Sequence, residues 1–316
     1  MKSAVFTEPQ QGATHDMLSR VAVTAEELGY DAFLRSDHLL KMGDVTGQPG
    51  PSEAWTNLAG LARDTSTIRL GTLVSPVTFR HPGIFATQVA QVDEMSGGRI
   101  DLGIGAGWFE AEHATHGLPF GESMGERFER FEEQLEILVA MWRTPAEKTF
   151  THAGKHYSLV DCPAIPKPAQ TDGEGRPAIP IVIGGSGKVK TPRLAATYAS
   201  EFNMPFPDLD TWKEQTARVR QACVDHGRDP DDLEWSFWFP IAVGRDDAEV
   251  ARRAAAIGRD VDEMVETAFG GSPQQVIDKI NLYREAGATK VGFQMLDLTD
   301  LDHIELVKSE VVDKLG

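Results

Sequence analysis

Short runs of apolar and β-branched residues recur along the chain, and an amphipathic stretch follows most of them. Runs of this length and composition are typical of buried β-strands. Eight of them fall at residues 3–7, 31–35, 68–74, 100–104, 179–184, 200–204, 234–243 and 290–296. Strands that alternate with helices indicate parallel βα units.

Two of the amphipathic stretches carry residues that mark helix ends. Ser52 precedes the stretch between the second and third strands and is a candidate N-cap. The stretch 272–287 begins at Ser272, continues with a proline and ends at Gly287. This order predicts a helix whose start and end are both set by local sequence.

Eight strands in a chain of 316 residues predict an α/β fold, a (β/α)8 TIM barrel that spans 1–316 as one domain. An open doubly wound sheet is the alternative, since the strand count from one sequence is uncertain by one or two. The fourth and fifth strands are unusually far apart. A helix over 125–142 takes up part of this separation, and 143–178 is rich in Pro, Gly, His and Thr. We interpret about 117–178 as an insertion that covers the barrel mouth, with a structural dimer arm as the alternative.

Composition and charge limit the partners. The formal net charge of −17 argues against nucleic acid and against anionic membranes, because both require a basic face. Apolar runs all fall short of the roughly 20 residues that span a bilayer. The two cysteines, Cys162 and Cys223, do not form a disulfide framework and predict a reducing compartment. We therefore expect a cytoplasmic protein that acts on a small molecule.

Two glycine clusters resemble nucleotide-binding loops, but neither has the required spacing. In "GIGAGW", Trp108 stands where the dinucleotide fingerprint needs its last glycine. In "GGSGKVKT", a Walker A loop would need glycine at Val182. The second cluster nevertheless lies between a strand and a helix, where backbone N–H groups and the helix dipole favour a phosphate. The predicted phosphate loop is Gly184, Gly185, Ser186 and Gly187, and a βα turn without a ligand is the alternative.

In a barrel, the residues just beyond each strand are the functional candidates. They are Thr7, Glu8, Gln10, Ser36, Asp37, His38, Leu73, Val74, Ser75, Gly105 to Trp108, Gly184 to Gly187, Asn203 and Gln294. Asp37 and His38 form the pair best suited to move a proton near neutral pH, and a solvent-facing loop pair is the alternative. Gln10 and Asn203 are expected substrate contacts.

Other polar and aromatic pairs have structural explanations. The pairs His113/His116 and His152/His156 have helical spacing, but no carboxylate completes a known metal signature, so we expect no metal. The pair Trp235/Trp238 is expected to pack on both faces of one strand.

Six motifs in order along the chain resemble one known family. They are "YDAFLRSDHL", "IRLGTLVSPVTFRHP", "GGRIDLGIGAGW", "IPIVIGGSG", "GSPQQVIDKI" and "VGFQMLDL". The set resembles the luciferase-like monooxygenase superfamily and is most similar to its branch that uses the deazaflavin coenzyme F420. The resemblance implies a barrel with an insertion between strands four and five, and hydride transfer between the deazaflavin C5 and a small organic substrate. An FMN-dependent monooxygenase with a separate flavin reductase is one alternative, and a cofactor-free barrel that acts as a partner subunit is another.

The resemblance also implies roles for single residues. It implies a non-prolyl cis peptide at Leu73–Val74, behind the cofactor ring. It places Asp37 and His38 against that ring, with His38 as the catalytic group. Further implied contacts are Gly105 and Trp108 as ring and substrate wall, the loop Gly184 to Gly187 on the phosphate, and Thr191 and Arg193 assisting it. Trp108 stands where deazaflavin sugar-phosphate dehydrogenases place a glutamate, which disfavours that substrate class. We expect a homodimer.

Overall fold

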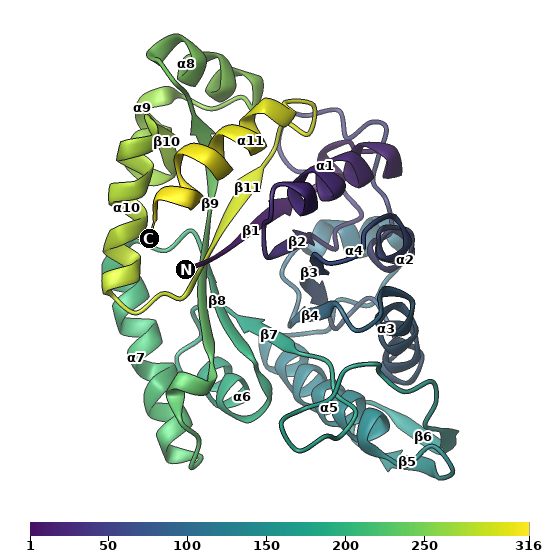
Figure 1. Cartoon of the computed structure of the whole chain (residues 1–316). Coiled ribbons are helices and arrows are strands. Elements are labelled where there is room, and N and C mark those ends of the chain that lie inside the picture. Colours follow the sequence, from purple (N-terminus) through teal and green to yellow (C-terminus); the bar gives the residue numbers. More distant parts are fainter. Residues whose placement is uncertain (316) are drawn as a thin grey trace.

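The computed structural model describes residues 1–315 and shows a closed barrel of eight parallel strands surrounded by helices (Figure 1). The barrel strands are β1 (Lys2–Thr7), β2 (Ala32–Arg35), β3 (Arg69–Pro76), β4 (Ile100–Gly105), β7 (Ile181–Gly184), β8 (Glu201–Pro205), β9 (Glu234–Val243) and β11 (Lys290–Met295). The sheet closes because β1 pairs with both β2 and β11, and β9 pairs with both β8 and β11. All eight predicted strands are confirmed. The fold is the predicted (β/α)8 barrel and not an open, doubly wound sheet.

Helices cover the outside of the barrel (Figure 1). Their bounds are α1 (His15–Glu27), α2 (Ala54–Asp64), α3 (Pro82–Ser96), α4 (Glu110–His116), α5 (Met124–Arg143), α6 (Lys190–Tyr198), α7 (Leu209–Asp225), α8 (Asp247–Ala256), α9 (Val261–Thr267), α10 (Pro273–Glu285) and α11 (Leu301–Glu310). A 3-10 turn, η1 (Pro9–Gln11), follows β1, and a short strand, β10 (Phe269–Gly271), extends the edge of β9. Within residues 1–315, every helix is too short or too polar to cross a bilayer.

Of the two predicted N-caps, Ser272 is confirmed and Ser52 is wrong. Ser272 caps α10 in a capping box with Gln275, as its sequence predicts. The N-cap of α2 is Glu53, whose carboxylate accepts a hydrogen bond from the N–H of Thr56. Ser52 is not the cap, because its hydroxyl and carbonyl oxygens accept hydrogen bonds from the buried Arg35.

Side chains alternate between the two faces of each strand, so they form one hydrophobic core under the helices and a second inside the barrel. Val5 packs outward against the helices, whereas Phe6 lies in the barrel interior. On β9, Trp235 packs outward against Phe202, and Trp238 packs inward against Phe6 with ring centroids 5.9 Å apart. The expected packing of this strand on both faces is confirmed.

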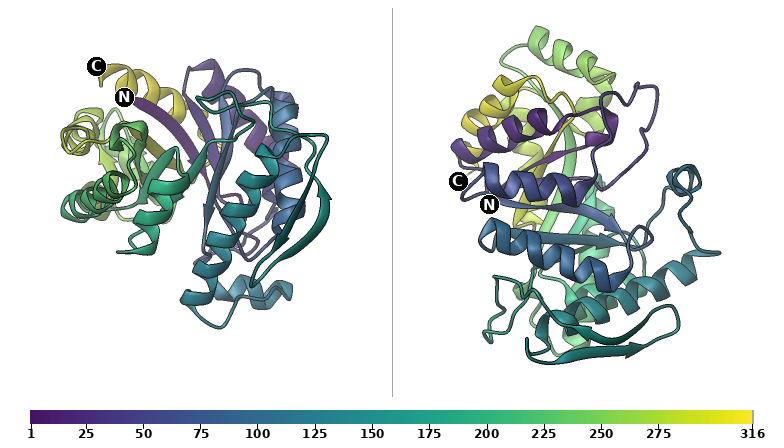
Figure 2. Two further views of the ribbon diagram at one scale, coloured as in Figure 1. Left: turned by 90° about the horizontal axis from the view of Figure 1, so that it is seen from below. Right: turned by 90° about the vertical axis from the view of Figure 1, so that its right-hand side faces the viewer.

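The insertion forms a hairpin that lies outside the barrel, along α5 (Figure 2). Its strands are β5 (Thr149–Ala153) and β6 (Ser158–Pro163), which pair antiparallel. The Tyr157 hydroxyl accepts a hydrogen bond from Gln134 of α5 at 2.8 Å, and Glu133 accepts the Tyr157 N–H.

The segment after the hairpin corrects the prediction of a cover over the mouth. Gln170 contacts Arg69 and the carbonyl of Ile100, which lie at the amino ends of β3 and β4. Asp93 anchors the segment there, because its carboxylate accepts hydrogen bonds from the N–H groups of Ala169 and Gln170. This part of the insertion therefore lies at the end of the barrel opposite the mouth.

A buried ion pair closes the amino end of the barrel. The Lys290 ammonium lies 2.8 Å from a carboxylate oxygen of Glu201, and both side chains are almost fully buried. Burial acts to lower the pKa of Lys290, but the carboxylates of Glu201 and Asp101 outweigh it and hold that pKa above its ordinary value. The ammonium is therefore charged, and it neutralises an almost fully buried carboxylate.

Replacing Lys290 with methionine is expected to lower the free energy of unfolding by about 3–5 kcal/mol, because Glu201 would stay buried without its cation. Urea unfolding measures the change. The double variant Lys290→Met/Glu201→Gln is expected to recover part of the loss, since it removes the uncompensated charge. Equal stabilities of the single and the double variant would contradict the role given to this ion pair.

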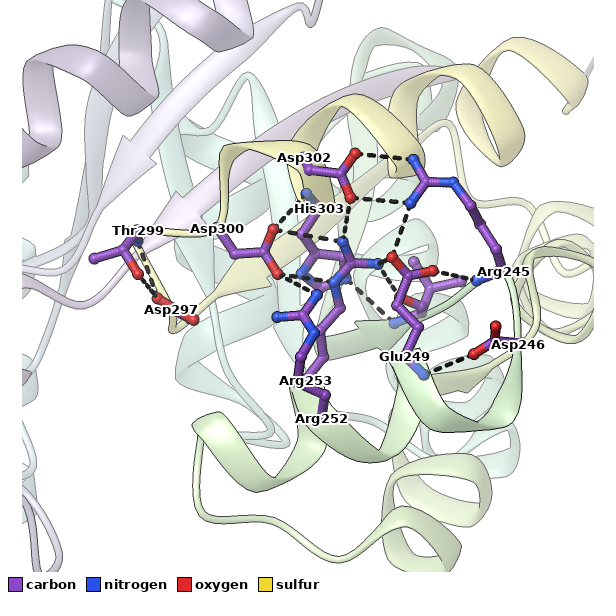
Figure 3. A network of polar contacts seen from close by, with 11 residues as sticks. Arg245, Asp246, Glu249, Arg252, Arg253, Asp297, Thr299, Asp300, Asp302 and His303 are labelled. Carbon is purple, nitrogen blue, oxygen red and sulfur yellow. Dashed lines mark hydrogen bonds and ion pairs between the residues drawn. The ribbon is translucent and has the colours of Figure 1, made fainter.

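A second ionic network joins the loops that follow β9 and β11 (Figure 3). Arg253 of α8 contacts Asp300 at 2.9 Å and Asp302 at 2.7 Å, both at the start of α11. Arg245 contacts the other oxygen of Asp302 at 2.9 Å. Beside them, the buried His303 accepts a hydrogen bond from the N–H of Val243 at 3.2 Å. The network ties α8 and α11 to the end of β9.

The pH dependence of stability should report on His303. Burial and the neighbouring Arg253 lower the pKa of His303 to about 3, whereas an unfolded histidine titrates near 6.5. The unfolded chain therefore binds a proton that the folded chain does not, so this contribution to stability is lost as pH falls below about 6.5. We expect a slope of about 1.4 kcal/mol per pH unit between about pH 6 and pH 4 from this one group.

Urea unfolding over that range measures the slope. His303→Gln keeps a hydrogen-bond acceptor and is expected to flatten the dependence, whereas His226→Gln, at the exposed end of α7, is expected to leave it unchanged. A slope that persists in His303→Gln would assign the pH dependence to another group.

Candidate functional site

His38 and Glu112 form a buried pair at the carboxyl ends of the strands. His38 follows β2, and its Nδ1 lies 2.9 and 3.1 Å from the two carboxylate oxygens of Glu112 on α4. Glu112 is 1% exposed and also accepts a hydrogen bond from the N–H of Leu39. The His38 side chain keeps 15% exposure. Because Glu112 occupies Nδ1, the other ring nitrogen, Nε2, is the one left for a ligand.

Glu112 is a candidate functional residue that no motif in the sequence indicates. It lies in "WFEAEH" beyond β4, far along the chain from His38. The only local signal is an acidic residue in a short helix next to a strand-end glycine cluster. Its partner is set by how α4 folds back over the barrel mouth, which no local pattern reports.

Two aromatic rings flank His38. Its ring meets Trp108 edge-on with centroids 5.7 Å apart, and Phe109 in the same manner at 6.2 Å. Trp108 and Phe109 stack at 5.3 Å, yet Trp108 is 64% exposed. A large apolar ring that is exposed beside a histidine is suited to contact an organic ligand.

The glycines of "GIGAGW" make room for a bulge in the neighbouring strand. The peptide Leu73–Val74 is cis, as the family resemblance implies, and the register of β3 against β4 shifts between Thr72 and Ser75. A Cβ on Gly103 would lie 2.1 Å from the Thr72 carbonyl oxygen. These glycines therefore let β4 approach the bulge and are not a phosphate loop.

Gly105 serves the same bulge. A Cβ on Gly105 would lie 3.0 Å from a methyl carbon of Val74. Its expected contact with a cofactor is therefore limited to its backbone, and it stays a prediction.

Asp37 lies beneath this bulge and not on a cofactor surface. Its carboxylate is fully buried, and it accepts hydrogen bonds from Ser75 at 2.6 Å and from Arg80 at 2.6 and 3.1 Å. Arg80 also pairs with Glu53, and Trp55 donates to Ser75. Both Asp37 oxygens are thus occupied, which corrects the expectation of a ring contact and makes Asp37 a support of the strand end.

The glycine loop after β7 has an open side. Gly185 has φ +120°, a conformation that favours glycine, and a Cβ there would meet no atom within 4 Å. Gln215 of α7 fixes the loop, because its side-chain amide donates hydrogen bonds to the carbonyl oxygens of Gly185 and Gly187. The N–H of Gly185 donates to Asn203, whereas those of Ser186 and Gly187 donate to no acceptor within residues 1–315. Free N–H groups in the loop just before α6 are suited to an anion.

The residues expected to assist this loop differ in placement. Thr191 is buried beside it, since a Cβ on Gly187 would lie 2.6 Å from the Thr191 hydroxyl. Arg193 points to α5 and pairs with both oxygens of Glu132 at 2.6 and 2.7 Å. Its guanidinium is therefore already paired with a carboxylate, and its assistance to a phosphate stays a prediction.

Gln10 and Asn203 are both buried. The Gln10 Oε1 accepts a hydrogen bond from Ser36 at 2.5 Å. The Asn203 amide donates to Ser236 at 2.9 Å inside the barrel. A substrate contact through that Asn203 N–H is therefore not available.

The paired histidines have structural partners. His113 contacts Thr78 and the Phe109 carbonyl, and His116 contacts the carbonyl of Glu112. His152 and His156 contact Glu133 and Glu129 on α5. Within residues 1–315, no group of three or more His, Cys, Asp or Glu side chains is arranged to hold a metal ion.

Known proteins are similar to this chain in sequence and in fold. The model of the luciferase-like monooxygenase family matches residues 1–263, so the chain belongs to this family of enzymes. It is 30% identical over 282 residues to the pyrimidine monooxygenase RutA of Bradyrhizobium sp. strain BTAi1, covering 84% of this chain and 72% of RutA. It is 29% identical over 300 residues to an F420-dependent glucose-6-phosphate dehydrogenase of Microbacterium testaceum strain StLB037, covering 86% and 84%.

The fold is similar to that of an F420-dependent secondary alcohol dehydrogenase solved with an F420–acetone adduct. The TM-score is 0.81 at 18% identity, covering 100% of this chain and 99% of the other. At that identity the likeness concerns the fold alone.

Proposed function

We propose that the protein is a coenzyme F420-dependent oxidoreductase that transfers a hydride between the deazaflavin C5 and a small organic substrate. The observation that carries this proposal is the His38–Glu112 pair, set beside the Leu73–Val74 bulge and the aromatic wall of Trp108. The relative from Microbacterium testaceum, which is named as F420-dependent, supports the choice of cofactor.

The residues present fit such a cofactor. The free N–H groups of Ser186 and Gly187, with the open face of Gly185, provide a phosphate cradle. The Leu73–Val74 bulge would back the ring. When bound, a deazaflavin supplies the carbon that accepts or donates the hydride.

The chain itself supplies orientation and proton handling. Glu112 fixes the His38 ring through Nδ1, as a buried carboxylate orients the histidine of a catalytic triad. His38 can then hold or move a proton at Nε2. Trp108 and Phe109 pack edge-on against the His38 ring and give an organic ligand an apolar surface beside it.

A monooxygenase that binds FMN and works with a separate flavin reductase is the second candidate. It is favoured by the similarity to RutA and by the glycine loop, which would serve an FMN phosphate equally well. Titration of the purified protein with F420 and with FMN, followed by absorbance and fluorescence, separates the two. We expect F420 to bind more tightly, and binding of FMN alone would overturn the deazaflavin proposal.

The substrate we propose is uncharged. The arginines that follow β9, namely Arg245 in the loop and Arg252 and Arg253 on α8, each contact a carboxylate and are not free for a phosphate group. Trp108 offers an apolar surface instead of an acid. We also propose a homodimer, which sedimentation analysis of the purified protein tests.

A further inference from the structure

Glu8 lies at the carboxyl end of β1, on the side of the strand that faces the barrel interior. Ala4 and Phe6 pack in the interior cluster, and side chains alternate along a strand. Glu8 continues that alternation just beyond Thr7, where η1 begins. A carboxyl group at this position faces the mouth, where active sites of such barrels lie.

The surroundings of Glu8 come from three elements. The side-chain amides of Gln11 of η1 and Gln294 of β11 lie beside its carboxylate, and His38, after β2, is close enough to interact with its charge. Burial raises the pKa of Glu8 above its ordinary value, and His38 and the two amides oppose that rise only in part. A carboxyl group of this kind exchanges its proton closer to neutral pH than an exposed one.

Two buried polar atoms beside Glu8 lack a protein partner. Within residues 1–315, the Gln10 Nε2 and the Gln294 Oε1 form no hydrogen bond, although Gln10 is 0% and Gln294 4% exposed. Buried polar groups in native proteins are nearly always paired. Gln294 lies beside the Glu8 carboxylate, and Gln10 is two residues from Glu8 in the chain, so the two unpaired atoms indicate a polar ligand atom near this position.

We infer that Glu8 is a second proton-exchanging group of the site and contacts the polar oxygen of an uncharged substrate. This inference rests on the proposed function. In the oxidative direction, the substrate's C–H bond breaks with its electron pair as the hydride passes to the deazaflavin, and the O–H proton passes to the Glu8 carboxylate. The substrate's C–O single bond becomes a double bond, so the substrate is oxidised and the deazaflavin is reduced.

One proton leaves the substrate oxygen in this step, and two groups handle it in turn: Glu8 takes it from the substrate and passes it to the neighbouring His38. Glu112 holds the His38 ring through Nδ1, which leaves Nε2 for that proton. Because Glu8 acts as the carboxylate, kcat/KM should fall as pH drops through its pKa. The wild-type profile should therefore show an acid limb that belongs to Glu8.

The experiment compares the wild type with Glu8→Gln and with Glu110→Gln, an exposed glutamate on α4 that serves as the matched control. Infrared difference spectra of the cofactor-free protein follow the carboxylic-acid carbonyl band against pH. Hydride transfer from cyclohexanol to F420 gives the pH profile of kcat/KM.

We expect a carboxylic-acid band that titrates above the ordinary glutamate value of about 4.3, is missing in Glu8→Gln and is retained in Glu110→Gln. We expect Glu8→Gln to lower kcat/KM at least about 100-fold and to lose the acid limb, with F420 affinity unchanged. A band at the ordinary value, or a Glu8→Gln variant that keeps the rate and the acid limb, overturns the inference. Failure of the wild type to bind F420 contradicts the proposed function instead.

Discussion

Replacing His38 with asparagine is expected to reduce turnover of the F420-loaded protein by about 100- to 10,000-fold, the usual contribution of a positioned acid or base. Asparagine keeps a polar side chain of similar reach but cannot exchange a proton near pH 7. If His38 only held the cofactor ring by one hydrogen bond of about 1 kcal/mol, the loss would be about fivefold. Single-turnover hydride transfer measured across pH distinguishes the two roles.

Two further variants make this test specific. Glu112→Gln keeps the shape and a hydrogen-bonding group at the His38 Nδ1 but removes the charge, so we expect a smaller loss and a changed pH profile. His116→Asn alters another α4 histidine, one that contacts the Glu112 carbonyl, and is expected to leave the rate unchanged. A loss under about tenfold for His38→Asn, with the profile unchanged, would leave His38 as a ring contact only.

Gly185→Val is expected to weaken cofactor binding by at least tenfold, or about 1.4 kcal/mol. The reason is steric. The space beside Gly185 is open, so a branched side chain would occupy the volume from which a phosphate approaches the loop. Equilibrium titration with F420, with a thermal unfolding curve for each variant, measures the effect.

Backbone strain needs its own control, because φ +120° at Gly185 disfavours any side chain. Gly29→Val provides it. Gly29 has φ +79°, also faces open space and ends α1 at the other end of the barrel. We expect both variants to lose stability and only Gly185→Val to lose cofactor affinity. Unchanged affinity in a folded Gly185→Val protein would remove the phosphate assignment.

The barrel was predictable because its signals are local. Each strand is a compact apolar run, such as 234–243, and the helix 272–287 carries its own cap and its own terminator. The order of these elements selects parallel βα units without any knowledge of distant contacts. The cis peptide at Leu73–Val74 came from the resemblance of several motifs and not from any one residue.

The errors share a different origin. Ser52 and Asp37 each have the residue type suited to the role predicted for them. Each is occupied by a charged partner: Arg35 for Ser52 and Arg80 for Asp37. A partner that is remote in the sequence changes neither the hydrophobic periodicity nor the neighbouring residues, so these pairings could not be predicted from local patterns.

The sequence by itself determined the order of strands and helices, that eight strands form a barrel, and that His38 and the glycine loop follow barrel strands at its mouth. Only the tertiary structure decided which nitrogen of His38 is left for a ligand, because that depends on Glu112. It also decided that Asp37 is buried and that the chain after the hairpin runs to the far end of the barrel. The physical reason is that hydrophobic periodicity is encoded within a few residues, whereas the pairing of buried charges is settled only when distant segments pack together.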